Sequence, residues 1–280
     1  MIKMWNNSHF FIVLIIKLIG DGMKIGDLVT RISHNHDMVF VITDEDEENY
    51  YLKGVNIRLC ADCKKSDAVL YTDKEDKDED DYLKRIKPEF DMDRNDYFYL
   101  PGKILHIDAD DDYLSRCIKY YNDAHIWSIG IKEDEKNIPG SIYNLLEEYR
   151  PSIVVITGHD AYYQRKNDSS NINNYKNSSY FVEAVKEARR YEKSHEKLII
   201  IAGACQSDYE ELIKAGANFA SSPKRINIHA LDPAVVATLM SLSDANKDID
   251  LKSILDKTKY GSKGMGGIRT KGTMYIGYPR

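Results

Sequence analysis

The sequence predicts an α/β protein: a doubly wound, mostly parallel sheet preceded by a small β-rich domain of SH3-like or meander type. From residue 100 onward, strand-like and helix-like patterns alternate, which is typical of parallel βαβ units. Two strand patterns, 152–160 and 197–205, are continuous apolar runs, as expected for central strands that are buried on both faces. Residues 24–60 instead contain short β-like runs separated by turn-forming residues, which indicates a distinct small domain.

The N-terminus carries an apolar run, HFFIVLIIKLIG at 9–20. It has the length of a signal-peptide core, but Lys17 interrupts it, no A-x-A cleavage site follows, and it is too short to span a membrane comfortably. Met23 begins MKIGDLVTRI, which suits the start of a folded domain. We therefore expect 1–22 to be an upstream extension that reflects the choice of start codon, and we expect no membrane span.

The small β domain is expected over 23–70, with strands in DLVTRI (27–32), MVFVIT (38–43) and VNIRLC (55–60). Residues 71–99 follow as a charged linker, because this segment has few apolar residues to offset its ordering entropy. An exposed helix or the acidic capture of a basic partner are the alternatives for this segment. Its exposed basic residues also suggest sites of self-cleavage, at Lys84, Arg85 and Arg94.

The α/β domain is expected over 100–280. Its predicted strands are 103–110, 126–132, 152–160, 197–205 and 218–223, followed by a final strand within 260–277. Its predicted helices are 111–124, 138–150, 177–194, 208–217, 232–242 and 250–259. The glycines of 260–277 do not follow the G-x-G-x-x-G pattern between a strand and a helix, so we predict no nucleotide site there.

Composition narrows the class of function. The chain has 280 residues, of which 42% are hydrophobic and 30% charged, so it can bury a core. Its net charge of −6 argues against general nucleic-acid binding. Four cysteines are too few for a disulfide scaffold and favour a reduced, intracellular setting. The C-x-x-C at 60–63 lacks a second pair, which leaves only a weak metal site helped by His34 or His36, so we expect neither metal nor cofactor.

Two residues with reactive side chains follow neighbouring predicted strands. His159 ends the run VVITGHD, and Cys205 ends the run IIIAGAC. Active sites of open α/β sheets lie outside the carboxyl ends of the strands, and neighbouring strands are about 4.8 Å apart. An imidazole and a thiol in these positions suit a cysteine hydrolase, in which the imidazole activates the thiolate. Taken alone, a cysteine in this position is usually a small core residue, and a histidine after a strand is usually a hydrogen-bonding loop residue.

A regulatory protein is the rival interpretation. HIDADDD (106–112) places acidic residues after the first strand, which is similar to the magnesium-binding cluster of a receiver domain. Asp160 would be the nearest phosphate acceptor, but it lies beyond Gly158 and His159 rather than at the strand end. The acids from Asp108 to Asp112 could instead be ordinary residues of a loop and of a first helical turn.

Long motifs closely resemble one known family. VITGHDAY, IIIAGACQS, AGANFASSPKRINIHALDP and GMGGIRTKG, with the IGDLV opening and PGKILHID, resemble the YabG family, the sporulation-specific peptidases of endospore-forming bacteria. The resemblance runs from about Met23 to the C-terminus. It implies a cysteine peptidase that processes spore coat and cortex-related proteins. The layout is similar to that of the caspase, gingipain and clostripain clan, which implies a caspase-like or flavodoxin-like strand order.

The resemblance also implies roles for individual residues. Cys205 would be the nucleophile, His159 the general acid and base, and cleavage would follow basic residues, notably Arg. In that clan a glycine usually follows the histidine and its amide helps to form the oxyanion hole. Asp160 takes that place here, so the expected oxyanion donors are the backbone N–H groups of Cys205 and Asp160.

A basic substrate side chain would need an acidic partner, for which the sequence offers Asp160, Asp208 and Asp232 without choosing among them. His229, in NIHALDP, is either a second base that contacts substrate or a structural loop residue. Ser207 is expected to cap the next helix. The expected partners are protein substrates in the mother-cell cytoplasm of a sporulating bacterium, with later association with the spore coat; the oligomeric state stays open.

Overall fold

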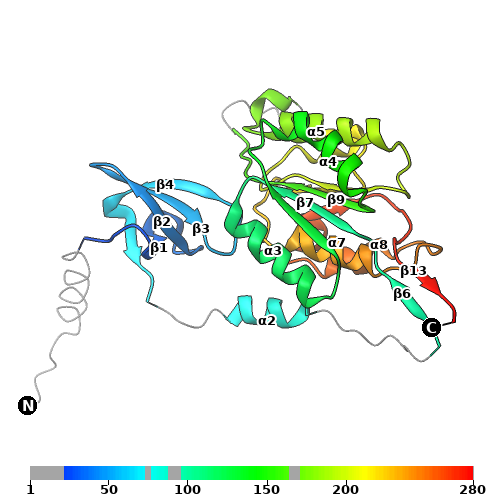
Figure 1. Cartoon of the computed structure of the whole chain (residues 1–280). Helices are drawn as coiled ribbons and strands as arrows, with labels where there is room; N and C mark the ends of the chain where they lie inside the picture. Colours follow the sequence, from blue (N-terminus) through cyan, green and yellow to red (C-terminus); the bar gives the residue numbers. More distant parts are fainter. Residues whose placement is uncertain (1–21, 73–76, 88–95, 164–170, 280) are drawn as a thin grey trace, which may run out of the picture. The chain divides into compact units, whose positions relative to one another are not determined.

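A computed structural model describes residues 22–72, 77–87, 96–163 and 171–279 (Figure 1). The chain divides into two compact units, Met1–Asp76 and Lys77–Arg280, and each is described by itself. Residues 1–21 of the expected extension and Arg94 of the expected self-cleavage segment lie outside the described residues. Among the helices that are described, none has the length and apolar character needed to cross a bilayer.

The first unit is a small antiparallel β domain, as predicted. Its five strands are β1 (Leu28–Arg31), β2 (Phe40–Glu45), β3 (Asn49–Gly54), β4 (Cys60–Lys64) and β5 (Ala68–Leu70). They lie in the order β4-β3-β2-β1-β5, so a four-strand meander is followed by a strand that returns to pair with β1. A single apolar cluster forms the core of this sheet and is built from Val29, Phe40, Ile42, Tyr50, Leu52, Cys63 and Ala68.

The predicted strand at 55–60 is wrong. Residues 55–59 connect β3 to β4, and only Cys60 belongs to a strand. The backbone groups of this connection are used in turns, since Gly54 N–H donates to the carbonyl of Leu59 and Leu59 N–H donates to that of Ile57. The alternating pattern that produces a strand begins earlier, where Tyr50 and Leu52 are buried and Tyr51 is exposed.

The second unit contains a six-stranded sheet in the order β12-β11-β10-β9-β7-β8. Its strands are β7 (Ile104–Asp108), β8 (Ser128–Lys132), β9 (Ile153–Thr157), β10 (Ile199–Ala202), β11 (Phe219–Ser221) and β12 (Met265–Gly267). The first five are parallel and β12 is antiparallel to β11, which confirms the mostly parallel sheet. Counted from β7, the parallel strands run 2-1-3-4-5, an order found in flavodoxin-like sheets. The caspase-like comparison stays a prediction.

Helices cover both faces of this sheet, because its strands are apolar on both sides. Figure 1 shows α4 (Ile138–Tyr149) and α5 (Ser178–Tyr191) on one face, where α6 (Tyr209–Ala215) packs against α5. It shows α3 (Asp111–Asp123) and α7 (Asp232–Ser241) on the other. This unit also contains α8 (Leu251–Asp256) and the 3₁₀ turns Ile172–Asn174 and Gly261–Lys263, and the first unit contains the 3₁₀ turns Ile32–His34 and Lys65–Asp67.

The segment 71–99 contributes regular structure to the second unit. Helix α2 (Lys77–Arg85) lies within it, and Tyr82 and Ile86 of this stretch are buried. Strand β6 (Phe98–Leu100) also begins there and pairs with β13 (Tyr275–Gly277) near the end of the chain. The apolar residues of this segment are few, but their spacing places them on one face of α2.

The sheet has a reversal of strand order at β7, which lies between β8 and β9. The helix between β7 and β8, α3, covers one face, whereas the helix between β8 and β9, α4, covers the other. The loops after β7, β9 and β10 all lie at the carboxyl edge of the sheet, which is the edge where ligands bind in open α/β sheets.

Candidate active site

The strand register places His159 and Cys205 at equivalent positions after two neighbouring strands. Ile156 of β9 pairs with Ala202 of β10, and the two strands are parallel. His159 follows Ile156 by three residues, and Cys205 follows Ala202 by three residues. Both side chains therefore come from the loops at the same edge of two neighbouring strands, as the sequence predicts.

The same register brings in a residue whose role the sequence analysis missed. Asp108 of β7 pairs with Thr157 of β9, and Asp110 and His159 each follow these partners by two residues. The His159 Nε2 atom lies 3.0 Å from Asp110 Oδ2. Because a carboxylate only accepts hydrogen bonds, Nε2 carries the proton, and Nδ1 is left as the basic nitrogen of the neutral ring.

Hydrogen bonds to the backbone fix the orientation of the Asp110 carboxylate. It is the N-cap of α3, and its Oδ1 accepts hydrogen bonds from the backbone N–H groups of Asp112 and Tyr113, each at 3.1 Å. Its own N–H donates to Asp108 Oδ1 at 2.9 Å. One carboxylate thus caps a helix with one oxygen and orients the imidazole of His159 with the other.

A buried polar chain supports this loop from inside the sheet. The Thr157 hydroxyl donates to Asp108 Oδ2 at 2.7 Å and accepts from His106 Nε2 at 2.8 Å. His106 Nδ1 in turn lies 2.9 Å from the Tyr121 hydroxyl. All of these side chains are fully buried, so their mutual hydrogen bonds replace the water that each has lost.

The backbone of His159 is fixed from the opposite side. Its N–H donates to Glu135 Oε1 at 2.8 Å, and its carbonyl accepts from Asn177 Nδ2 at 2.8 Å. A Cβ atom on Gly158 would lie 2.7 Å from Glu135 Oε1 and 3.0 Å from Ala109 Cβ. A side chain at position 158 would therefore displace the Glu135 carboxylate that accepts the His159 N–H.

Cys205 lies within a tight turn after β10. Gly203 has φ +102, a conformation that suits glycine, and the turn closes where Ala204 N–H donates to Ser207 Oγ at 2.9 Å. The thiol is fully buried. Its sulfur accepts a hydrogen bond from the backbone N–H of Ile228 at 3.2 Å and lies 3.8 Å from the carbonyl oxygen of the same residue.

Ser207 does not cap the next helix, so that prediction is wrong. Helix α6 begins one residue later than expected, and Asp208 is its N-cap, accepting from the N–H of Glu211 at 3.4 Å. The Ser207 hydroxyl instead closes the turn at Ala204 and donates to Asp160 Oδ2 at 2.9 Å. It links the Cys205 turn to the residue that follows His159.

Asp160 is buried and surrounded by donors. Its carboxylate accepts from the N–H groups of Ala161 and Asn177 at 2.9 and 2.8 Å and from the hydroxyls of Ser178 and Ser207. Burial raises the pKa of Asp160, and these hydrogen bonds offset only part of that effect. Within the described part of the chain, no acceptor pairs with its backbone N–H.

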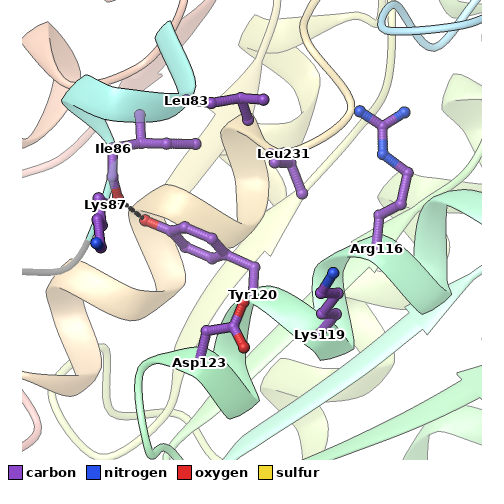
Figure 2. Close-up of a pocket in the computed structure, with 8 residues that line it drawn as sticks. All are labelled: Leu83, Ile86, Lys87, Arg116, Lys119, Tyr120, Asp123 and Leu231. Carbon is purple, nitrogen blue, oxygen red and sulfur yellow. Dashed lines mark hydrogen bonds between the residues drawn. The ribbon is translucent and has the colours of Figure 1, made fainter. Parts of the chain in front are cut away.

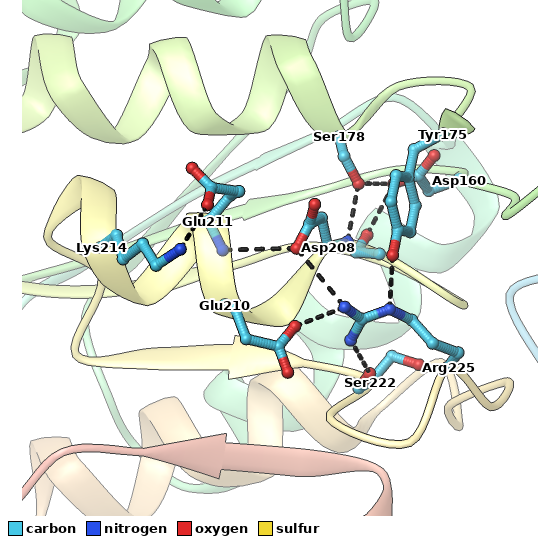
Figure 3. A network of polar contacts seen from close by, with 10 residues as sticks. Asp160, Tyr175, Ser178, Asp208, Glu210, Glu211, Lys214, Ser222 and Arg225 are labelled. Atoms are coloured by element: carbon cyan, nitrogen blue, oxygen red, sulfur yellow. Dashed lines mark hydrogen bonds and ion pairs between the residues drawn. The ribbon is translucent and has the colours of Figure 1, made fainter. Parts of the chain in front are cut away.

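Asp208 belongs to a polar network at the start of α6 (Figure 3). The Arg225 guanidinium lies 3.5 Å from Asp208 Oδ1, forms an ion pair with Glu210, and donates from Nε to the Tyr175 hydroxyl at 2.6 Å. Asp208 Oδ2 is buried and has no hydrogen-bond partner among the described residues. Burial raises the pKa of Asp208, although Arg225 lowers it in part.

The last two predicted residues, His229 and Asp232, are fully buried and contact helix α2. His229 Nε2 lies 3.0 Å from Glu79 Oε1, and Asp232 Oδ1 accepts from the Tyr82 hydroxyl at 2.7 Å. Asp232 also accepts from the N–H of Lys259 at 2.7 Å, so both of these side chains are occupied by contacts within the unit.

The described residues do not form a metal site. They contain no group of three His, Cys, Asp or Glu side chains arranged to hold one. Asp108, the first acid of the receiver-like motif, is engaged with Thr157 and Asp110. Cys60 is exposed and Cys63 buried on the single strand β4, so the two thiols of the C-x-x-C face different sides.

Comparison with known proteins agrees with the motif resemblance. The family model described as YabG peptidase U57 matches residues 24–279. The chain is similar to the sporulation-specific protease YabG of Bacillus subtilis (strain 168), with 39% identity. The match covers 91% of this chain and 98% of that protein.

Proposed function

Because this chain belongs to the YabG peptidase family, we propose that it is a cysteine endopeptidase of sporulation with Cys205 as nucleophile and His159 as general base and acid. The observation that carries the proposal is the register that sets Asp110, His159 and Cys205 after three adjacent strands at the reversal of strand order. The experiment that tests it is a cleavage assay of Cys205→Ala, which should lose activity.

The proposed reaction has two steps. His159 takes the thiol proton of Cys205, the sulfur attacks the peptide carbonyl carbon, and a C–S bond replaces the C–N bond as His159 gives the proton to the leaving amine. Water, deprotonated by His159, then attacks the thioester, and the carboxylic acid leaves with restoration of the thiol. Asp110 orients the ring for both steps and stabilises its protonated form.

Backbone donors are proposed to stabilise the oxyanion that forms during each step. The N–H of Asp160 follows the histidine, and the N–H of Cys205 follows the Gly203–Ala204 turn. The four donors that fix the Asp160 carboxylate also fix the peptide that carries its N–H. Rigid donors of this kind need no reorganisation during the reaction.

Access to the thiol requires a local movement. The Cys205 side chain is fully buried, so a peptide carbonyl reaches its sulfur only after some of the surrounding side chains are displaced. His159 is partly exposed, with 19% of its side chain open to solvent, which marks the side from which the substrate approaches.

We propose that Asp208 recognises the basic side chain before the scissile bond. It follows Cys205 by three residues, and its Oδ2 is buried without a hydrogen bond among the described residues. Asp160 and Asp232, the other candidates, already accept several hydrogen bonds. The Arg225 guanidinium next to Asp208 and Glu210 illustrates that this cluster accommodates a guanidinium (Figure 3).

Asp208→Asn is expected to reduce the preference for Arg over Gln at the cleaved position by about 10- to 100-fold, the usual worth of a hydrogen bond to a charged group. Asparagine keeps the N-cap of α6, so stability should change little. The measurement is kcat/KM for two fluorogenic peptides that differ only at this residue. Glu211→Gln in the same helical turn is the control and should keep the preference.

The preference should also depend on pH. Burial raises the pKa of Asp208, so its charge is lost at a higher pH than that of an exposed aspartate as the solution is acidified. The measurement is the ratio of kcat/KM for the two peptides as a function of pH, in the wild type and in Asp208→Asn. The same ratio in both proteins at every pH would contradict the role of Asp208 in specificity.

Asp110→Asn is expected to lower kcat by about a hundredfold or more while the fold is retained. The asparagine oxygen can still cap α3, but the amide nitrogen then faces His159 Nε2. The ring is forced to present Nε2 as an acceptor and to carry its proton on Nδ1, which leaves no base for the thiol. Asp111→Asn, at an exposed neighbouring position, is the control. Equal kcat in the two variants would contradict the orienting role.

We further propose that the substrates are spore coat and cortex-related proteins in the mother cell, cleaved after basic residues. The family membership supports a role in sporulation, and the acidic cluster at Asp208 supports the basic preference. Incubation of extracted coat proteins with the enzyme, followed by N-terminal sequencing of the products, tests both points. Fragments that begin after neutral residues would contradict the preference.

A further inference from the structure

Helix α2 turns one face toward the rest of the second unit. Glu79, Tyr82 and Ile86 are spaced by three and four residues and are all buried, with 9, 2 and 5% exposure. Beyond the Tyr82 contact with Asp232, Arg85 donates to the carbonyl of Thr258 at 3.2 Å. The helix is therefore fixed by polar contacts to residues about 150 positions away in the chain.

A pocket of about 490 Å³ lies between α2 and α3, and Leu83 and Ile86 line it from the side of α2 (Figure 2). At its edge the Tyr120 hydroxyl donates to the carbonyl of Ile86, as the dashed line in the figure shows. This contact ties the end of α2 to α3, the helix that begins beside Asp110.

His229 contacts the first turn of α2. Its Nε2 lies 3.0 and 3.1 Å from the two carboxylate oxygens of Glu79, and its Nδ1 accepts from the N–H of Leu231 at 3.1 Å. The proton of the neutral ring therefore lies on Nε2 and points at Glu79. The backbone N–H of His229 donates to Asp232 Oδ2 at 3.1 Å, so the whole residue is fixed.

The charges around this ring favour an ionised Glu79. Burial raises the pKa of Glu79, but the hydrogen bond from His229 and the positive charges of Lys259 and Arg116 act against it, and the net pKa is lowered. The other titratable groups that face the ring are Asp232 and Tyr82, whose ring centroid is 4.5 Å from that of His229. Glu79 is therefore a charged acceptor at neutral pH.

The residue before His229 contacts the proposed nucleophile. The N–H of Ile228 donates to Cys205 Sγ at 3.2 Å. A hydrogen bond to the charged form of a group favours that form, so this N–H favours the thiolate. The carbonyl of Ile228, at 3.8 Å, is an acceptor for the thiol proton only, so the orientation of this segment influences which form is preferred.

We propose that Glu79 is a positioning residue: through His229 it holds the Ile228 N–H against Cys205, so that docking of α2 sets the reactivity of the nucleophile. This rests on the proposed function of Cys205. It assigns to the acidic helix α2 a role in the peptidase site.

The test is the pH profile of Cys205 alkylation by iodoacetamide in the full-length protein. Mass spectrometry of the tryptic fragment 198–214, which contains no other cysteine, reports on this thiol alone. Glu79→Ala should move the midpoint of the profile upward by about one pH unit, which is about a tenfold slower reaction at neutral pH. Glu79→Gln should restore the profile in large part, because its amide oxygen still accepts from His229 Nε2.

Asp81→Ala, at an exposed position of the same helix, is the matched control and should leave the profile unchanged. Should Glu79→Ala fail to fold, Glu79→Met fills a similar volume without an acceptor and is judged by the same criterion. Superimposable profiles for a folded Glu79 variant and the wild type would overturn this inference. Full cleavage by Cys205→Ala would instead overturn the proposed function, so the two failures are distinguishable.

Discussion

Cys205→Ala is expected to lower the rate of peptide-bond cleavage by at least about 10⁴-fold, because no other group would form the covalent intermediate. The side chain is small and its replacement removes one sulfur from a fully buried site, so the fold should be retained. The measurement is the cleavage of extracted coat protein and of a fluorogenic arginine peptide by purified variants with matched thermal unfolding.

Cys117→Ala is the matched control for this experiment. Cys117 is also fully buried, but it lies in α3, where its sulfur is 3.6 Å from the carbonyl oxygen of Ala230. It should keep full activity with a modest loss of stability. Equal residual activity in the two alanine variants would mean that the effect of Cys205 arises from packing and not from chemistry.

His159→Ala is expected to have the second largest effect, a loss of about 10³- to 10⁴-fold in kcat/KM. The variant lacks both the base that activates the thiol and the acid that protonates the leaving amine. Alkylation of Cys205 by iodoacetamide should slow at neutral pH for the first of these reasons. Kinetics of cleavage and of alkylation on the same preparation measure the two effects together.

An exposed histidine of the first unit, His34, serves as the control, and His34→Ala should match the wild type in both assays. Retention of normal alkylation and normal cleavage in His159→Ala would assign the base to another residue. His229 is not an alternative in the geometry described, since its two ring nitrogens are engaged with Glu79 and with the N–H of Leu231.

Much of the second unit could be predicted because its signals are local. Apolar runs such as Ile153–Thr157 and Ile199–Ala202 are buried on both faces, and their alternation with helical patterns leaves few topologies open. Once β9 and β10 are neighbours, the equal overhang of His159 and Cys205 follows from their sequence positions. The proximity of these two loops was therefore accessible from the sequence.

The role of Asp110 was not accessible in the same way. The five residues from the end of β7 onward, 108–112, include four aspartates, Asp108, Asp110, Asp111 and Asp112. Spacing alone does not tell which of them faces the histidine. The register of β7 with β9 selects Asp110. Its position as the residue before a helical pattern was the available signal, because an N-cap carboxylate has one oxygen left for another partner.

The docking of α2 illustrates a second limit. Most residues of this helix are charged, as in a solvated segment. Its contacts, however, are with residues about 150 positions later in the chain. The spacing of Tyr82 and Ile86 was a weak signal for a buried face. The first unit gives another example. The alternating pattern at 55–60 predicted a strand, because the apolar pattern does not show backbone turns such as the one that joins Gly54 N–H to the Leu59 carbonyl.

The most direct test of the central claim is covalent labelling with an arginine-containing peptide acyloxymethyl ketone, followed by tryptic mapping. The reagent needs a nucleophile and a basic-residue subsite together, so it reports on the assembled site. The result predicted here is a single adduct on fragment 198–214, at Cys205, which is absent in Cys205→Ala and slow to form in His159→Ala. An adduct on any other fragment, with Cys205 unmodified in active enzyme, would contradict Cys205 as the nucleophile.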